Sequence, residues 1–141
     1  MPALYQFLPE AKRAFAFLST YGLAIEVERE GTYASFKDGF TLVWASKGLS
    51  VEVTYHDMEL EVIFRRGGVS ASYLFLDHNL HANASGFAGC MFPFEKLTPV
   101  IDAIAKDIEA HYEDVLRSDF EVWRKIEKLV LAPKETKPFL P

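Results

Sequence analysis

The chain has 141 residues, of which 50% are hydrophobic and 14% aromatic, and a formal net charge of −5. A chain of this length and composition can bury a core of its own, which excludes an intrinsically disordered protein. The acidic balance and the single cysteine, Cys90, argue against a nucleic-acid partner and against a disulfide scaffold. The sequence has neither a signal-peptide pattern nor an apolar run of bilayer length, so we expect a cytoplasmic protein without a membrane partner.

The first predicted element is an amphipathic helix over residues 9–20. A proline at its first position suits the first helical turn, and Ala11, Phe15 and Leu18 recur at helical spacing. Gly22 is placed to end this helix.

Residues 23–66 predict an antiparallel meander of five strands. Tight turns at 57–58 and 47–48, a three-residue loop at 37–39 and a turn at 30–31 each carry a Gly or Asp signal. A one-residue slip would move the apolar side chains of a strand to the wrong face, so the pairings test the assignment. All four turns are consistent with one sheet that has a single apolar face.

The predicted register fixes which residues share that apolar face. It places Val53 opposite both Leu42 and Val62, and it places Ile25 opposite Phe36. The predicted inner face consists of Ile25, Val27, Phe36, Phe40, Leu42, Trp44, Val51, Val53, Tyr55, Leu60, Val62 and Phe64.

The chain after the meander is less regular. Residues 67–93 are rich in Gly, Asn and His, and within them 72–76 fits either a sixth short strand or a helical turn. Helical periodicity returns over 98–131, as either one long helix or two helices with a capping box at Ser118. Prolines then predict a mobile tail at 133–141, which leaves residues 1–132 as a single domain.

The width of the sheet limits how many helices can cover it. Five strands span about 24 Å and a helix is about 10 Å across, so about two helices cover one face. The helix over 9–20 and the helix from Thr98 form the natural pair. Residues 118–131 then either extend past the sheet or cover the irregular loop, and they could contribute to a homodimer interface.

The opposite face of the predicted meander carries carboxylates around apolar residues. Such a surface suits a basic protein partner, because aromatic and aliphatic anchors lie inside a charged rim. The alternative is an ordinary solvated sheet face. The candidate partner-binding residues are Glu26, Glu28, Tyr33, Glu52, Glu61 and Ile63.

A second group could carry chemistry. The His-x-x-His spacing of His78 and His81 can supply two metal ligands, to which Asp77 or Cys90 could add a third. Cys90 with either histidine could also form a nucleophile and base pair. The competing interpretation is a structural loop with a buried cysteine, and we predict no cofactor. Two arginines in 65–68 precede a Gly-Gly pair and could bind an anion, although no helix start follows them closely.

Three stretches carry a resemblance to a known group of proteins. They are the helix end 15–23, with the sequence Phe-Ala-Phe-Leu-Ser-Thr-Tyr-Gly-Leu, the strand 33–36 and the hairpin 49–65. In these stretches the chain resembles small bacterial single-domain proteins, some of which are immunity proteins of polymorphic or contact-dependent toxin systems. The resemblance covers the first half of the chain, implies a protein that neutralises a toxin by binding it, and assigns no residue role.

The sequence therefore predicts an α+β domain with an N-terminal helix, a five-stranded antiparallel meander, an irregular loop and one or two C-terminal helices on one sheet face. The predicted function is non-enzymatic protein binding, in which the carboxylates of the outer face pair with a basic toxin and occlude it. The two alternatives are a small metal- or thiol-dependent enzyme that uses residues 77–90 and a homodimeric structural protein.

Overall fold

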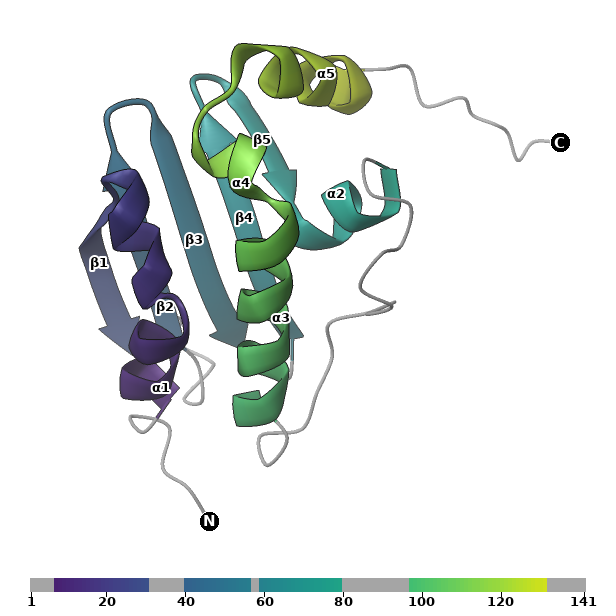
Figure 1. The fold of residues 1–141 in the computed structure, drawn as a ribbon. Helices are drawn as coiled ribbons and strands as arrows, with labels where there is room; N and C mark the ends of the chain where they lie inside the picture. The colour runs from purple at the N-terminus through teal and green to yellow at the C-terminus, as the bar shows by residue number, and fades with distance from the viewer. Residues whose placement is uncertain (1–6, 31–39, 57–58, 80–96, 132–141) are drawn as a thin grey trace, which may run out of the picture.

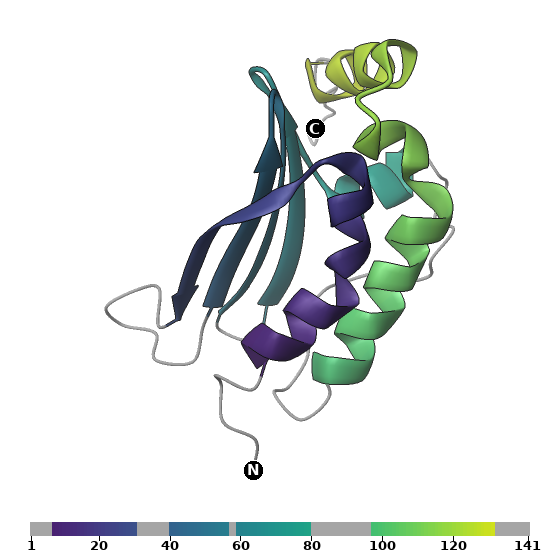
Figure 2. The same ribbon diagram turned by 60° about the vertical axis from the view of Figure 1, so that its left-hand side comes forward.

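A five-stranded antiparallel sheet with helices against one face forms the fold, as predicted (Figures 1 and 2). The computed structural model describes residues 7–30, 40–56, 59–79 and 97–131. Its elements in chain order are α1 (Phe7–Ala14), η2 (Ala16–Tyr21), β1 (Ala24–Glu30), β2 (Phe40–Ser46), β3 (Leu49–His56), β4 (Glu59–Arg66), β5 (Val69–Ser72), α2 (Tyr73–Asn79), α3 (Leu97–His111), α4 (Glu113–Leu116) and α5 (Phe120–Leu131).

The strands follow one another across the sheet in the order β1-β2-β3-β4-β5. The predicted register of the three central strands is confirmed, because Val53 pairs with Leu42 on one side and with Val62 on the other. Gly48 adopts a φ of 82° in the turn between β2 and β3, a conformation that glycine reaches without steric cost. Local turn chemistry therefore sets this part of the sheet.

The strand that flanks β2 differs from the prediction. Ile25 of β1 pairs with Trp44 of β2, so its predicted partner Phe36 is wrong. The prediction placed a strand at 32–36 between β1 and β2. Since β1 pairs directly with β2, that position in the sheet does not exist. Phe36 itself falls outside the described residues. The fifth strand is instead β5, which a tight turn at Gly67 and Gly68 folds back onto β4.

A β-bulge in β1 reverses which of its side chains face the helices. Ile25 lies opposite Trp44 and Val27 lies opposite Val43, so the bulge inserts Glu26 as the extra residue. Residues directly opposite in an antiparallel pair share a face, so the bulge shifts the alternation by one. Val27 therefore lies on the outer face and not on the inner face as predicted. Glu28 lies opposite the inner-face residue Leu42, which corrects its predicted place on the outer face.

The core lies between the sheet and the helices, which stand side by side over one face (Figure 2). Ile101, Ile104 and Ile108 of α3 are buried in it at helical spacing. Of the other residues predicted for the inner face, Phe36 lies outside the described residues, Ile25 is 37% exposed at the outermost strand, and the remaining nine are buried. The buried members are Phe40, Leu42, Trp44, Val51, Val53, Tyr55, Leu60, Val62 and Phe64.

Charged side chains join the outer part of the helical layer to its neighbours. Lys12 of α1 lies 2.9 Å from the carboxylate of Glu28, which is where the bulge has directed that side chain. Arg13 bonds both Glu10 on its own helix, at 2.6 Å, and Asp102 on α3, at 3.0 Å. The first helix thus contacts both the sheet and α3.

The predicted helix over 9–20 is split. An α-helical part is followed by the 3₁₀ helix η2, which ends at Gly22 as predicted. Gly22 has a φ of 84°, and its N–H donates to the carbonyls of Leu18 and Ser19. The left-handed residue therefore satisfies carbonyls that the helix end would leave open.

The C-terminal segment is not one long helix, so that alternative is wrong. The chain turns between α4 and α5 at Ser118, whose φ is 58°. Asp119 caps α5, because its Oδ1 accepts a hydrogen bond of 3.0 Å from the N–H of Val122. In this position α5 extends past the end of the sheet beside β5 (Figure 1). Within the described ranges, no helix has the length and apolar character needed to cross a membrane.

Candidate functional site

The outer face of the sheet is the first candidate site. All the described helices lie on the other face, so nothing in the described ranges packs over this one (Figure 2). By the observed register, one row across it runs through Val27, Val43, Glu52 and Ile63. The three apolar side chains in this row are half-buried, which leaves an accessible apolar centre on the face.

The charges on this face are of both signs. Arg65 lies 2.6 Å from Glu52 through its Nη1, and Arg29 stands opposite Thr41 in the neighbouring row. Glu61 is exposed at the other end of that row. The face therefore differs from the acidic surface that was predicted, because β1 and β4 each contribute an arginine.

The six predicted partner-binding residues are only partly brought together. Glu52, Glu61 and Ile63 lie on the outer face in the predicted register. Glu26 is the exposed bulge residue, and Glu28 lies on the helical side. The sixth, Tyr33, falls outside the described residues.

A pair of threonines makes the centre of the outer face rigid. The hydroxyls of Thr41 and Thr54 lie 2.9 Å apart, and that of Thr54 donates to the carbonyl of Phe40 at 3.1 Å. Since each hydroxyl has one hydrogen, Thr41 must donate to Thr54. Both residues are only 6% exposed. These hydroxyls therefore link β2 to β3 at the centre of the outer face.

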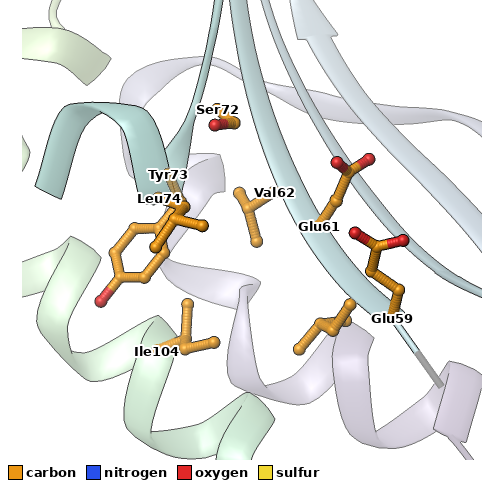
Figure 3. A pocket seen from close by; sticks show the side chains of 8 residues that line it. Glu59, Glu61, Val62, Ser72, Tyr73, Leu74 and Ile104 are labelled. Atoms are coloured by element: carbon orange, nitrogen blue, oxygen red, sulfur yellow. The ribbon is translucent and has the colours of Figure 1, made fainter. Parts of the chain in front are cut away.

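A small cavity lies beside the first residues of β4 (Figure 3). Glu59 and Glu61 border it on the outer side, whereas Tyr73, Leu74 and Ile104 border it on the helical side. Its volume is about 60 Å³, far below the roughly 300 Å³ of a small pocket for an organic ligand. This cavity does not suit a small-molecule substrate.

Between α2 and α3 lies a buried polar cluster, which we define as Tyr73, Asp77, Asp107 and Tyr112. The hydroxyl of Tyr73 donates to Oδ2 of Asp107 at 2.7 Å, and Asp77 is 1% exposed. Burial raises the pKa of Tyr112 well above its usual value, and Tyr73, Asp77 and Asp107 raise it further. The Tyr73–Asp107 hydrogen bond joins α2 to α3, and Tyr112 is completely buried and therefore out of reach of a substrate.

The predicted chemical group is not assembled in the described part of the chain. Asp77 belongs to the buried polar cluster, and His78 follows it in α2. His81 and Cys90 fall outside the described residues. Among the side chains in the described ranges, no three His, Cys, Asp or Glu residues are grouped so that they could hold a metal ion. The metal and thiol assignments stay predictions.

The two arginines of the Arg-Arg-Gly-Gly stretch point to opposite faces of the sheet. Arg65 pairs with Glu52 on the outer face, whereas Arg66 lies on the side of α5. There it borders a groove of about 230 Å³, which sequence reasoning missed. The groove depends on how α5 docks against β5, and only the apolar Phe120 at the helix start could have indicated it. Its lining residues are Arg66, Val69, Phe120, Trp123, Arg124 and Glu127.

Comparisons with protein-family models, curated proteins and solved structures give no match to this chain. The resemblance to toxin-system immunity proteins therefore stays a prediction.

Proposed function

We propose that the protein is a non-enzymatic binding module that takes up a protein partner on the outer face of its sheet. The observation that carries this proposal is the uncovered row of half-buried apolar side chains at Val27, Val43 and Ile63. Apolar side chains inside a charged rim are the usual composition of a protein interface.

The dimensions of the face support a protein as the ligand. Five strands of about seven residues cover roughly 24 by 23 Å, or about 550 Å². This is somewhat less than the roughly 800 Å² that each partner buries in a standard interface. A partner that reaches slightly beyond the sheet would complete such an interface.

The charges favour a partner with a basic region. Glu59 and Glu61 are both exposed on β4, and Glu26 is exposed on β1. Arg65 is already paired to Glu52, and Arg29 lies at the β1 end of the row that Glu61 ends on β4. The resemblance implies that the partner is a toxin, and the carboxylates would steer and orient a basic region of that toxin while the protein occludes it.

The test compares two charge reversals. Glu61→Lys lies on the outer face, and Glu109→Lys lies on the exposed side of α3 behind the helical layer. The wild type and Glu109→Lys should capture the same partner from the native host. Glu61→Lys should not capture it. The partner would then be purified and its affinity for each form measured by calorimetry.

A complementary variant removes the apolar centre. Val43→Asp introduces a charge at a half-buried position of the outer face and should lower the affinity for the partner by at least roughly tenfold. Circular dichroism and thermal unfolding would establish that each variant is folded. Equal affinity of a common partner for the wild type and both outer-face variants would contradict the proposed function.

A further inference from the structure

Helix α5 carries an exposed stripe, which we define as Phe120, Arg124, Glu127 and Leu131. Their spacing places them within a sector of roughly 60° around the helix. Phe120 is 67% and Leu131 70% exposed, which makes them two of the three large hydrophobic side chains exposed in the described ranges. The stripe therefore has an apolar residue at each end and two opposite charges at its centre.

The other side of α5 is firmly anchored, so the stripe is held in a fixed direction. Trp123 is buried, and its Nε1 donates to the carbonyl of Val115 on α4 at 3.0 Å. Ile126, one turn further along, is completely buried. Since these residues already bind α5 to the rest of the fold, the stripe lies on a different side of the helix from them, along the groove that α5 forms with β5.

The stripe is complementary to itself when it is read in the opposite direction. A two-fold axis that passes between residues 125 and 126 would pair each residue with a residue of the second copy that lies equally far from the axis in the opposite direction along the helix. Phe120 would then meet Leu131 of the second copy, and Arg124 would meet Glu127 of the second copy. Self-complementarity of this kind is what a two-fold symmetric interface requires.

The geometry points to a second copy of this chain as the occupant of the stripe, in an antiparallel α5–α5 pairing. Two apolar pairs would lie at the ends and two Arg–Glu pairs at the centre. Phe120, Arg124 and Glu127 of the stripe also line the groove against β5, which offers room for the partner's apolar end. The outer face of the sheet takes no part, so this inference does not rest on the proposed function.

The size of α5 sets the expected strength. Twelve residues extend about 18 Å, so the pairing buries less surface than a standard interface and gives a weak dimer. Dimer formation should therefore depend on concentration, and sedimentation equilibrium over roughly a hundredfold range of protein concentration would detect it.

Charge reversal gives the decisive test, because the two centre residues can be exchanged. In a dimer of Arg124→Glu, a glutamate at position 124 faces a glutamate at position 127 of the other copy. In a dimer of Glu127→Arg, arginines occupy both positions and face each other in the same way. We expect each variant alone to dimerise at least about tenfold more weakly than the wild type. An equimolar mixture restores opposite charges at both centre pairs, so the mixture should associate within about threefold of the wild type.

Lys125→Glu is the matched control, since Lys125 is exposed on α5 but lies outside the stripe. This variant should dimerise like the wild type, and circular dichroism would establish that all four proteins are folded. A wild type that stays monomeric, a mixture that does not associate, or a control as weak as the two charge reversals would each overturn the inference.

Discussion

Tyr112 occupies an environment that disfavours a negative charge on its side chain. It is completely buried, and its ring stacks on Phe64 with centroids 5.5 Å apart and packs against Tyr73 at 5.6 Å. The carboxyls of Asp77 and Asp107 lie close enough to oppose a negative charge on its hydroxyl. The fold therefore requires Tyr112 to remain protonated.

This requirement predicts a loss of stability in alkaline solution. The pKa of Tyr112 is raised in the folded state above the unfolded value of 10.0, so above pH 10 the unfolded chain releases a proton that the folded chain keeps. The free energy of unfolding should fall by about 1.4 kcal/mol per pH unit from this group. We expect Tyr112→Phe to show a correspondingly shallower decline in urea unfolding measured below and above pH 10.

Tyr21→Phe is the matched control for this experiment. Tyr21 is only half-buried and lies beneath the guanidinium of Arg117, 5.5 Å from its ring centroid. This variant tests whether the loss of any tyrosine hydroxyl changes the alkaline decline, and a decline as shallow as that of Tyr112→Phe would count against Tyr112 as the cause. Identical declines in the wild type and Tyr112→Phe would contradict the assignment.

At the scale of the elements, two helices end at a residue in the left-handed backbone region. One of these residues is a glycine, and the other is a serine, which carries a Cβ. Ser118 has a φ of 58° between α4 and α5, and Gly22 has a φ of 84° after η2. The left-handed region costs a residue with a Cβ about 1–2 kcal/mol, whereas glycine occupies it freely. Ser118→Gly should therefore raise the free energy of unfolding by a few tenths to about 1 kcal/mol, after the entropy of the added glycine is subtracted.

The reverse change at Gly22 provides the control. Within the described part of the chain, and apart from the two neighbouring residues, no atom lies within 4 Å of the position that a Cβ would take there, so the cost of Gly22→Ala comes from the backbone. We expect a loss of about 1 kcal/mol in urea unfolding. Opposite signs for the two substitutions are the expected result, and a destabilised Ser118→Gly would count against this account of the junction.

The elements also show where sequence reasoning succeeds. The hairpins of β2, β3 and β4 were predictable because two-residue turns fix each register locally, as at Gly48. The pairing of β1 with β2 spans residues 31–39 and is not fixed by a tight turn, so the local apolar pattern could not determine it. The bulge at Glu26 adds one residue without a signature of its own, and it is why Glu28 was assigned to the wrong face.

The candidate site follows the same division. Glu52, Glu61 and Ile63 lie where the hairpin register placed them. Arg65 could have been assigned to the outer face by the same alternation, but its ion pair with Glu52 depends on the diagonal across β3 and β4 and on the twist of the sheet. The stripe on α5 could not be predicted, because Trp123 and Ile126 show which side of α5 is buried only after the helix has docked.

At the scale of the whole molecule, α5 and the sheet share one hydrophobic core. Trp44 lies on β2 and Trp123 on α5, and both are buried members of the same cluster. A single cooperative unit should report one unfolding transition from any of its parts. We expect Trp44→Phe, which leaves Trp123 as the fluorophore, to give one midpoint by fluorescence and by circular dichroism.

The converse variant, Trp123→Phe, leaves Trp44 as the reporter of the sheet. Its fluorescence and circular dichroism midpoints should also coincide with each other. An earlier fluorescence transition of Trp123 in the first variant would show that α5 unfolds separately.

The bulge in β1 also bears on how the sheet avoids growth by strand addition. An outermost strand that is flat, regular and apolar is a template on which further strands can assemble into aggregates. Four of the seven residues of β1 are charged, and the bulge interrupts its regular spacing of backbone donors and acceptors. At the opposite border β5 is only four residues long. The irregularity that moves Glu28 toward the helices thus also makes the molecule a poor seed for fibrils.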